Sequence, residues 1–222
     1  MRSIIPQLFT LAAIVPVALE IACGNAGATV VLPDPRENVA LAPKPARDTA
    51  VFAGGCFWGI QAVFQHVKGV ISATSGYAGG TIPDPSYELV STGSTGYAES
   101  VEVIYDPSVV TYGDLLKVFF SVAHDPTELN FQGPDHGTQY RSAIFYANAA
   151  QEKLAKSYIA QLTQAKAFKE PIVTQVTPLT KFWPAESYHQ DYLNKHPTQP
   201  YIVINDIPKV EALKAQYPAL YQ

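Results

Sequence analysis

The chain has 222 residues and a formal net charge of −4, from 15 Lys and Arg against 19 Asp and Glu. This length is enough for one domain with its own hydrophobic core and some additional segments. Because the charge is mild and no run of Lys or Arg occurs, the sequence excludes a strong electrostatic footprint for nucleic acid.

Residues 1–28 have the pattern of a secretory leader. Arg2 precedes an apolar stretch from Ile4 to Leu19, and small residues around Ala28 provide a cleavage site. The stretch is shorter than the ~20 apolar residues that a membrane-spanning helix needs. We therefore expect an exported protein, periplasmic or secreted, with a lipid anchor on Cys23 as the minor alternative.

Cleavage after Ala28 would remove Cys23 and leave Cys56 as the only cysteine of the mature chain. A single thiol in an oxidising compartment cannot form an internal disulfide, and its presence there indicates reactivity. The next segment, residues 29–48, is a proline-rich arm whose composition favours extended chain, either as a tether or as an ordered arm. Residues 49–222 are expected to form a single catalytic domain.

The periodic pattern from Thr49 onward predicts strands and helices in a defined order. The expected elements are a strand at Ala50–Ala53, a helix at Phe57–Val67, a strand at Val70–Gly76, a strand at Ser100–Tyr105, a helix opened by a capping box of Thr111 and Asp114, a strand at Ser142–Tyr146, a long helix from Asn148, and an edge strand at Ile172–Val176. The first six follow the split βαβ order. We predict an α+β two-layer sandwich with a ferredoxin-like core, a mixed sheet and a long irregular C-terminal segment beyond Phe182.

Cys56 follows an apolar strand and two glycines, and it stands where the helix from Phe57 begins. Gly54 and Gly55 permit a tight turn and the close approach of a ligand. The unpaired N–H groups and positive dipole end of a helix N-terminus favour thiolate, the nucleophilic form of cysteine. We therefore expect a reactive thiol with Phe57 and Trp58 as an apolar wall behind it; the alternative is a small buried core residue.

Glu99 is in phase with the apolar residues Val101, Val103 and Tyr105 of the alternating strand that follows it. This parity can direct its carboxylate into an apolar site, where desolvation would keep it protonated near neutral pH. A protonated carboxylic acid can serve as a general acid. The alternative from parity alone is a carboxylate at the rim of the sheet, in water.

A polar loop at Asn130–Ser142 concentrates hydrogen-bonding side chains, among them Asp135, His136 and Tyr140. Loops of this kind often build sites, although Asp135 taken alone is typical of a turn and His136 of a surface ring. The 5 histidines are scattered, and none pairs with another at helical ligand spacing. We therefore expect no metal site.

Five segments in fixed order resemble one known family. They are GCFWG (Gly55–Gly59), GYAGG (Gly76–Gly80), TGYAESVEVIYDP (Thr95–Pro107), DHGTQYRS (Asp135–Ser142) and YHQDYL (Tyr188–Leu193). Together they resemble peptide methionine sulfoxide reductase of the A type, an enzyme class that restores methionine from one sulfoxide epimer. The resemblance implies reduction of methionine S-sulfoxide, free or in proteins, through a cysteine sulfenic acid.

The resemblance also implies residue roles. Cys56 matches the nucleophile that attacks the sulfoxide sulfur, and Glu99 matches the acid that helps protonate the departing oxygen. The implied substrate-binding residues are Phe57 and Trp58 around the methyl group, Tyr87 and Tyr140 as hydroxyls that hold the oxygen, and Asp135 close to the bound substrate.

Two departures from the family pattern bear on regeneration and on hydrogen bonding. Tyr97 stands where the family commonly has histidine, so the surroundings of Glu99 are expected to differ. No resolving cysteine occurs in Lys209–Gln222. We expect an external thiol, thioredoxin-like or small, to reduce the sulfenic acid with no bound cofactor; the alternative reductant is an unprocessed Cys23. The other expected partners are oxidised proteins or free methionine sulfoxide, and a membrane only if Cys23 carries a lipid.

Two rival functions remain open at this point. One is another thiol enzyme, a peroxidase or an acyl-transferring hydrolase in which Cys56 works with His136 or His189, because spacing alone cannot place a histidine beside the sulfur. The other is a non-catalytic module that binds oxidised methionine in the same pocket.

Overall fold

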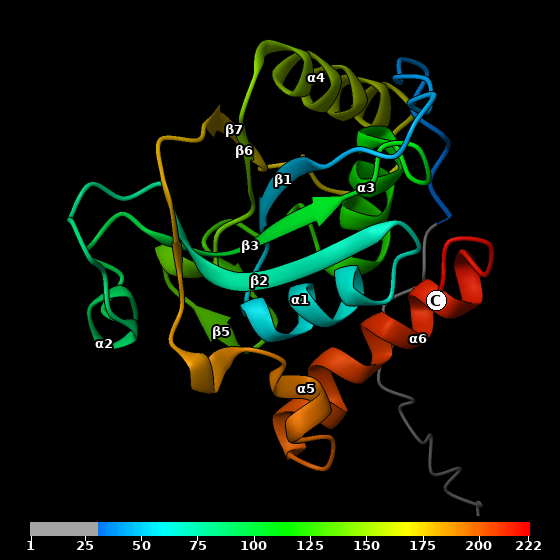
Figure 1. Ribbon diagram of the computed structural model, residues 1–222. Helices are drawn as coiled ribbons and strands as arrows, with labels where there is room; N and C mark the ends of the chain where they lie inside the picture. Colours follow the sequence, from blue (N-terminus) through cyan, green and yellow to red (C-terminus); the bar gives the residue numbers. More distant parts are fainter. Residues whose placement is uncertain (1–30) are drawn as a thin grey trace, which may run out of the picture.

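A six-stranded sheet forms the centre of the computed structural model, which describes residues 31–222 (Figure 1). The leader expected at residues 1–28 lies outside the described residues. The strands are β1 (Asp48–Ala53), β2 (Val70–Ala78), β3 (Ala98–Tyr105), β6 (Ala143–Tyr146), β7 (Gln175–Pro178) and β8 (Phe182–Pro184), and a separate hairpin pairs β4 (Phe131–Gln132) with β5 (Asp135–His136).

The strand order β7-β6-β1-β3-β2-β8 contains the predicted core at its centre. The four strands β6-β1-β3-β2 are antiparallel neighbours joined in the split βαβ order, while β7 adds to β6 in parallel. The α+β class, the ferredoxin-like core and the mixed sheet are therefore confirmed.

The helices cover mainly one face of this sheet. They are α1 (Phe57–Gln65), α2 (Tyr87–Val90), α3 (Tyr112–Val118), α4 (Ala149–Gln164), α5 (Tyr192–Lys195) and α6 (Ile207–Gln216), with π-helical turns at Phe119–Ala123 and Ile202–Asp206 and 3₁₀ turns at Thr138–Tyr140 and Ser187–His189. The main core lies between the sheet and these helices, with Phe52 stacked between Phe64 and Phe119. None of the helices within residues 31–222 is long and apolar enough to cross a membrane.

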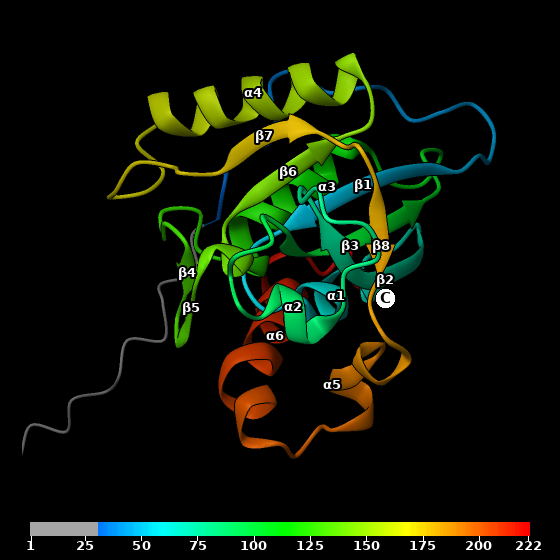
Figure 2. The same ribbon diagram turned by 90° about the vertical axis from the view of Figure 1, so that its left-hand side faces the viewer.

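The opposite face of the sheet is covered by a single pass of chain. Mostly small side chains of the sheet on this face pack against Leu179, which follows β7, and Phe182, the first residue of β8. Because β7 and β8 are the two edge strands, the connection between them crosses the face of the curled sheet (Figure 2).

Two predicted helix starts are confirmed in detail. Thr111 and Asp114 form the capping box of α3, each accepting the backbone N–H of the other, at 3.1 and 3.0 Å. The side chain of Asn148 caps α4 by accepting the N–H of Gln151 at 3.0 Å.

The edge strand predicted at residues 172–176 is confirmed as β7, but it begins later than predicted, at Gln175, and runs to Pro178. The reason is a competing partner: the N–H of Val173 donates to the carbonyl of Pro126 at 2.8 Å, so this part of the chain pairs with a loop and not with the sheet. The C-terminal segment is also less irregular than expected, since β8 pairs with β2.

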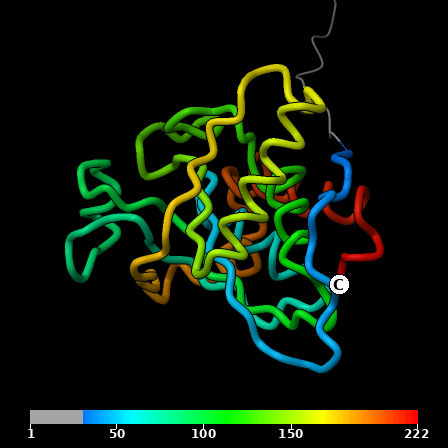
Figure 3. The backbone as a smooth tube through the Cα atoms, turned by 90° about the horizontal axis from the view of Figure 1, so that it is seen from above, coloured from blue at the N-terminus to red at the C-terminus, as the bar shows by residue number. Residues whose placement is uncertain are grey.

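The described part of the proline-rich arm is ordered and lies against α3 and α4. Leu32 is only 1% exposed, and the hydroxyl of Tyr158 donates to the carbonyl of Pro33 at 2.8 Å. Lys117 joins the arm to the chain end, since its ammonium lies 2.6 Å from Asp34 and 4.9 Å from the ring centroid of Tyr217. The arm and the C-terminus therefore lie side by side (Figure 3).

Candidate active site

Cys56 lies at the turn between β1 and α1, as the sequence predicted. It is the N-cap residue of α1 and 8% exposed. Gly55 has φ +95°, a conformation that favours glycine, and a Cβ there would lie 2.6 Å from the side chain of Gln132. A Cβ on Gly54 would lie 2.7 Å from the ring of His124. Both glycines are thus required for the chain to pass beneath these side chains and present the thiol.

A cavity of about 180 Å³ opens over the sulfur. It is lined by Cys56, Phe57, Trp58, Tyr87, Glu99, Asp135, Tyr140, Gln199 and Tyr201. All seven site residues named from the sequence therefore converge on one cavity, from segments far apart in the chain. Gln199 and Tyr201 are the two that sequence reasoning missed.

The thiol is not the thiolate that the helix N-terminus led us to expect. Burial raises the pKa of Cys56 well above its ordinary value, and the negative charges of Glu99 and Asp206 raise it further. The N–H of Trp58 and the charge of Lys209 lower it, but they are outweighed. Desolvation and neighbouring carboxylates thus override the helix dipole, and the resting cysteine carries its proton.

Glu99 is buried, as its strand parity predicted, and the alternative of a carboxylate in water is wrong. It is 2% exposed, and its Oε2 accepts the N–H of Phe57, the first residue of α1, at 3.0 Å. Burial raises the pKa of Glu99 to about 8, more than the hydrogen bond from Phe57 lowers it. A carboxyl with this pKa holds a proton at neutral pH beside the thiol.

Phe57 and Trp58 form the apolar wall of the cavity. Phe57 is fully buried, and its ring lies 6.5 Å from that of Trp58. The indole of Trp58 stacks on Tyr192 with ring centroids 3.8 Å apart, and its Nε1 donates to Nδ1 of His189 at 3.2 Å. The C-terminal segment therefore holds Trp58 in place from behind.

Tyr87 and Tyr140 bring hydroxyl groups to the cavity. The backbone N–H of Tyr87 donates to Glu186 at 2.9 Å, which fixes the start of the short helix α2. Burial, and then the charge of Glu99, raises the pKa of both tyrosines. Both groups remain neutral hydrogen-bond donors across the physiological range.

Asp135 lies on the β4–β5 hairpin, and its Oδ2 accepts a hydrogen bond from the hydroxyl of Tyr201. Tyr201 also meets the edge of Trp58, with ring centroids 5.9 Å apart at 86°. The only sequence signal for Tyr201 is its position shortly after the YHQDYL segment, since no periodic element carries it. The hairpin and the C-terminal segment thus close the same side of the cavity.

The histidines considered as partners of the thiol do not line the cavity. His136 is exposed and stacks on Phe131, with ring centroids 5.4 Å apart. His189 is buried behind Trp58, and its Nδ1 accepts a hydrogen bond from the indole N–H of Trp58. A Cys–His pair is therefore not formed within residues 31–222, and the hydrolase alternative loses its base.

Tyr97 does not enter the site in place of the family's histidine. Its ring packs over Gly80, and its hydroxyl donates to the carbonyl of Ile82 at 2.6 Å. Among the described residues this hydroxyl is therefore bonded within the loop and makes no hydrogen bond to Glu99.

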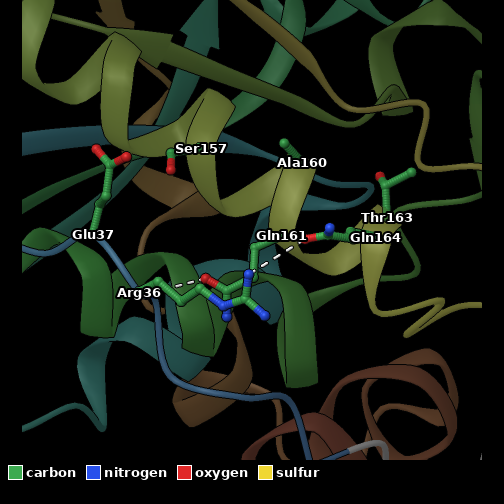
Figure 4. A pocket seen from close by; sticks show the side chains of 7 residues that line it. All are labelled: Arg36, Glu37, Ser157, Ala160, Gln161, Thr163 and Gln164. Carbon is green, nitrogen blue, oxygen red and sulfur yellow. Dashed lines mark hydrogen bonds between the residues drawn. The ribbon is translucent and has the colours of Figure 1, made fainter.

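A larger hollow of about 630 Å³ lies elsewhere, between the arm and α4 (Figure 4). There the N–H of Arg36 donates to Gln161 at 2.8 Å, and its guanidinium donates to Gln164 at 3.3 Å. The remaining lining residues are Glu37, Ser157, Ala160 and Thr163, and Glu37 is paired with Lys153 at 2.9 Å. No cluster of three or more potential metal ligands occurs in the part of the chain that the structure describes.

The comparisons with known proteins agree with this geometry. The sequence pattern of the family described as peptide methionine sulfoxide reductase matches residues 48–220. A protein named peptide methionine sulfoxide reductase MsrA 2 from Mesorhizobium japonicum is 63% identical over 177 residues, covering 80% of this chain and 91% of its own. Its namesake from Synechocystis is 49% identical over 189 residues, covering 84% and 88%.

Solved structures with related folds carry similar names. Mxr1 from Saccharomyces cerevisiae in reduced form has a TM-score of 0.62 at 35% identity, covering 74% of this chain and 92% of its own. Methionine sulfoxide reductase A of Corynebacterium diphtheriae has a TM-score of 0.61 at 36% identity, covering 78% and 87%. With the family pattern matched over most of its length, this chain belongs to the peptide methionine sulfoxide reductase family.

Proposed function

We propose that this chain reduces methionine S-sulfoxide, free or within proteins, with Cys56 as the nucleophile and Glu99 as the acid. The observation that carries the proposal is the cavity of about 180 Å³ in which the thiol and the buried carboxyl share one aromatic-walled space. A soft nucleophile, an apolar cradle for a methyl group and a proton donor are the three requirements of this reaction, and each has a candidate there.

The chemical step balances without any cofactor. The sulfur of Cys56 attacks the sulfoxide sulfur while Glu99 donates a proton to the sulfoxide oxygen. The S–O bond of the substrate then breaks and the hydroxyl passes to Cys56, so that a thiol and a sulfoxide become a sulfenic acid and a thioether. The proton that the Cys56 thiol loses when it reacts passes to Glu99, so Glu99 is protonated again at the end of the step.

The cavity walls support substrate orientation. Phe57 and Trp58 present apolar surface on which the substrate methyl group can be removed from water. Tyr87 and Tyr140 are neutral donors suited to the developing negative charge on the oxygen. Asp135, fixed by Tyr201, lines the same cavity and would contact the substrate backbone or amine.

An external thiol would complete the cycle. Cys56 is the only cysteine within residues 31–222, so the sulfenic acid has no partner in the described fold. Two thiol groups from a thioredoxin-like protein or a small thiol would restore Cys56 and release a disulfide and water. Reduction by Cys23 remains the alternative, and its test is whether a Cys23→Ser variant turns over as fast as the parent chain with the same external thiol.

Export of the chain is part of the proposal and rests on the leader pattern of residues 1–28. Mass spectrometry of the mature protein should show a chain that starts after Ala28 and carries no lipid. A mature chain that retains Cys23 with an added diacylglycerol would replace the secreted form by the anchored one.

The function itself is tested with the purified chain and the two sulfoxide epimers. With dithiothreitol, only the S epimer should be consumed, and Cys56→Ser should abolish turnover. Peroxide and a thioester, offered in parallel, should not be consumed at a comparable rate; if either is, the peroxidase or hydrolase alternative takes precedence.

A non-catalytic binding module would give a different result in a trapping experiment. A sulfenic-acid reagent should label Cys56 only after the sulfoxide has been added. Tight binding of the sulfoxide without labelling would identify the chain as a binding protein.

A further inference from the structure

A second buried carboxylate lies against the first turn of α1, outside the cavity lining. Asp206 ends the π-helical turn Ile202–Asp206 and is 0% exposed. Its Oδ1 lies so close to Gly59, the third residue of α1, that a Cβ on Gly59 would collide with it. The absence of a side chain at Gly59 is what admits this carboxylate to the N-terminal end of the helix that carries Cys56.

The carboxylate is only partly satisfied by its neighbours. Oδ1 lies 3.2 Å from the ammonium of Lys209, one turn later on α6. A Cβ placed on Gly59 would also lie 3.0 Å from this ammonium, so Lys209 reaches the same point on α1. Oδ2 has no hydrogen-bond partner among the described residues. A buried carboxylate oxygen without a hydrogen bond lowers the stability of the folded chain, and such groups occur where a structure uses their charge.

Several ionisable groups face this pair and the thiol from other elements. On the cavity side they are Glu99 from β3, Asp135 from β5, Tyr87 from α2, Tyr140 from a 3₁₀ turn, and Tyr201. On the side of Lys209 they are His124 and Glu128. Asp206 and Lys209 do not line the cavity and lie against Gly59 of α1.

The two members of the pair act on Cys56 with opposite sign. The negative charge of Asp206 raises the pKa of Cys56, and the positive charge of Lys209 lowers it, in addition to the larger effect of burial. The same carboxylate also raises the pKa of Glu99. The pair is thus placed to act on both protons that the reaction uses.

We propose that Asp206, held against Gly59 by Lys209, is a positioning residue that keeps a proton on Cys56 in the resting site, and that Lys209 limits its effect. This inference rests on the proposed function, in which Cys56 is the nucleophile. Its consequence is that loss of the Asp206 charge should make the thiol more reactive toward adventitious oxidants at a given pH, since thiolate is the form that oxidants attack.

The test follows the alkylation of Cys56 by iodoacetamide as a function of pH, in the full chain, with the modified cysteine identified by peptide mass spectrometry. Asp206→Asn should shift the midpoint of the alkylation profile to lower pH by about one unit, as expected for one charge removed from a buried neighbourhood. Lys209→Gln should shift it to higher pH, and Lys209→Arg, which keeps the charge, should restore the parent profile.

The opposite directions distinguish a charge effect from a structural one. A loosened site would move both variants the same way, and that result, or the absence of any shift, would overturn the proposal. If Asp206→Asn does not fold, the Lys209→Gln and Lys209→Arg pair decides alone. Alkylation needs no sulfoxide, so failure here is separate from failure of the proposed reaction, which the epimer assay reports.

Discussion

The split βαβ core and the C-terminal segment contribute to the same cavity in different ways. The core supplies the reacting groups: Cys56 is the N-cap of α1, in the turn that follows β1, and Glu99 lies on β3, where it is paired with Tyr77 of β2. The segment beyond β8 supplies Gln199 and Tyr201 to the outer wall, and it packs Tyr192 behind Trp58. The reacting groups thus depend on the core of the fold, whereas the outer wall of the cavity depends on a segment held by side-chain contacts.

This difference predicts that changes in the core affect the chemical step, whereas changes in the C-terminal segment affect the fit of the substrate. The two can be separated by comparing single-turnover rates with substrate affinities. The largest effects are expected where a reacting group is removed.

Glu99→Gln should lower the single-turnover rate of sulfoxide reduction by about 10² to 10⁴-fold, the usual range for loss of a general acid. The amide fits the same space and can accept the N–H of Phe57, but it cannot give a proton. Rapid-quench measurement of methionine formation checks this. Glu102→Gln on the same strand is the matched control, because Glu102 points to the opposite face and does not line the cavity. An unchanged rate in Glu99→Gln would remove Glu99 from the mechanism.

The pH profile should report the same group. Burial raises the pKa of Glu99 to about 8, and the protonated form is the active one, so the rate should fall about tenfold per unit as pH rises above 8. Single turnovers with saturating substrate between pH 6 and 10 measure this. Glu99→Gln should lose this limb of the profile; if the limb persists in the variant, another group is titrating.

The raised pKa of Glu99 also has a consequence for stability, with a definite sign. The pKa of this carboxyl is about 8 in the folded chain and near its ordinary value of 4.5 when the chain is unfolded. Its protonated form therefore favours folding below pH 4.5, and this contribution is lost as pH rises through 8. Glu99→Gln, which cannot ionise, should raise the melting temperature at pH 8 more than at pH 5. A smaller gain at pH 8 than at pH 5 would contradict the assignment of a buried, protonated carboxyl.

Tyr201→Phe tests the C-terminal side of the comparison. The variant keeps the ring against Trp58 but removes the donor to Asp135, leaving a carboxylate at the cavity without its partner. We expect substrate affinity to weaken about tenfold, since an unpaired polar group costs about 1–3 kcal/mol, with a smaller change in the single-turnover rate. Tyr221→Phe, near the end of the same segment and stacked on His66, is the control and should change neither. Loss of rate without loss of affinity would place Tyr201 among the reacting groups instead.

The same contrast explains what the sequence could and could not predict. Glu99 was predictable because strand parity is a local property, and the strand predicted at Ser100–Tyr105 is confirmed, with its start extended back to Ala98 so that it includes Glu99. The protonation state of Cys56 was not, since the local signal, a helix N-terminus, is outweighed by burial and by Asp206, which is 150 residues away in the chain. Tyr201 has no periodic neighbours that would assign it a face, so only packing against Trp58 reveals it.

The arm sharpens the comparison, because it is as irregular in sequence as the C-terminal segment but lies far from the cavity. Its buried residue Leu32 joins the main core, so Leu32→Ala should lower the free energy of unfolding by about 2–5 kcal/mol through lost contacts and a cavity. Leu41→Ala, 52% exposed in the same arm, should change it by less than about 0.5 kcal/mol. Chemical denaturation measures both, and in each folded variant the single-turnover rate should match that of the parent chain. A rate loss in folded Leu32→Ala would mean that the arm, like the C-terminal segment, holds the site together, and the division between a reacting core and an enclosing segment would then need a third part.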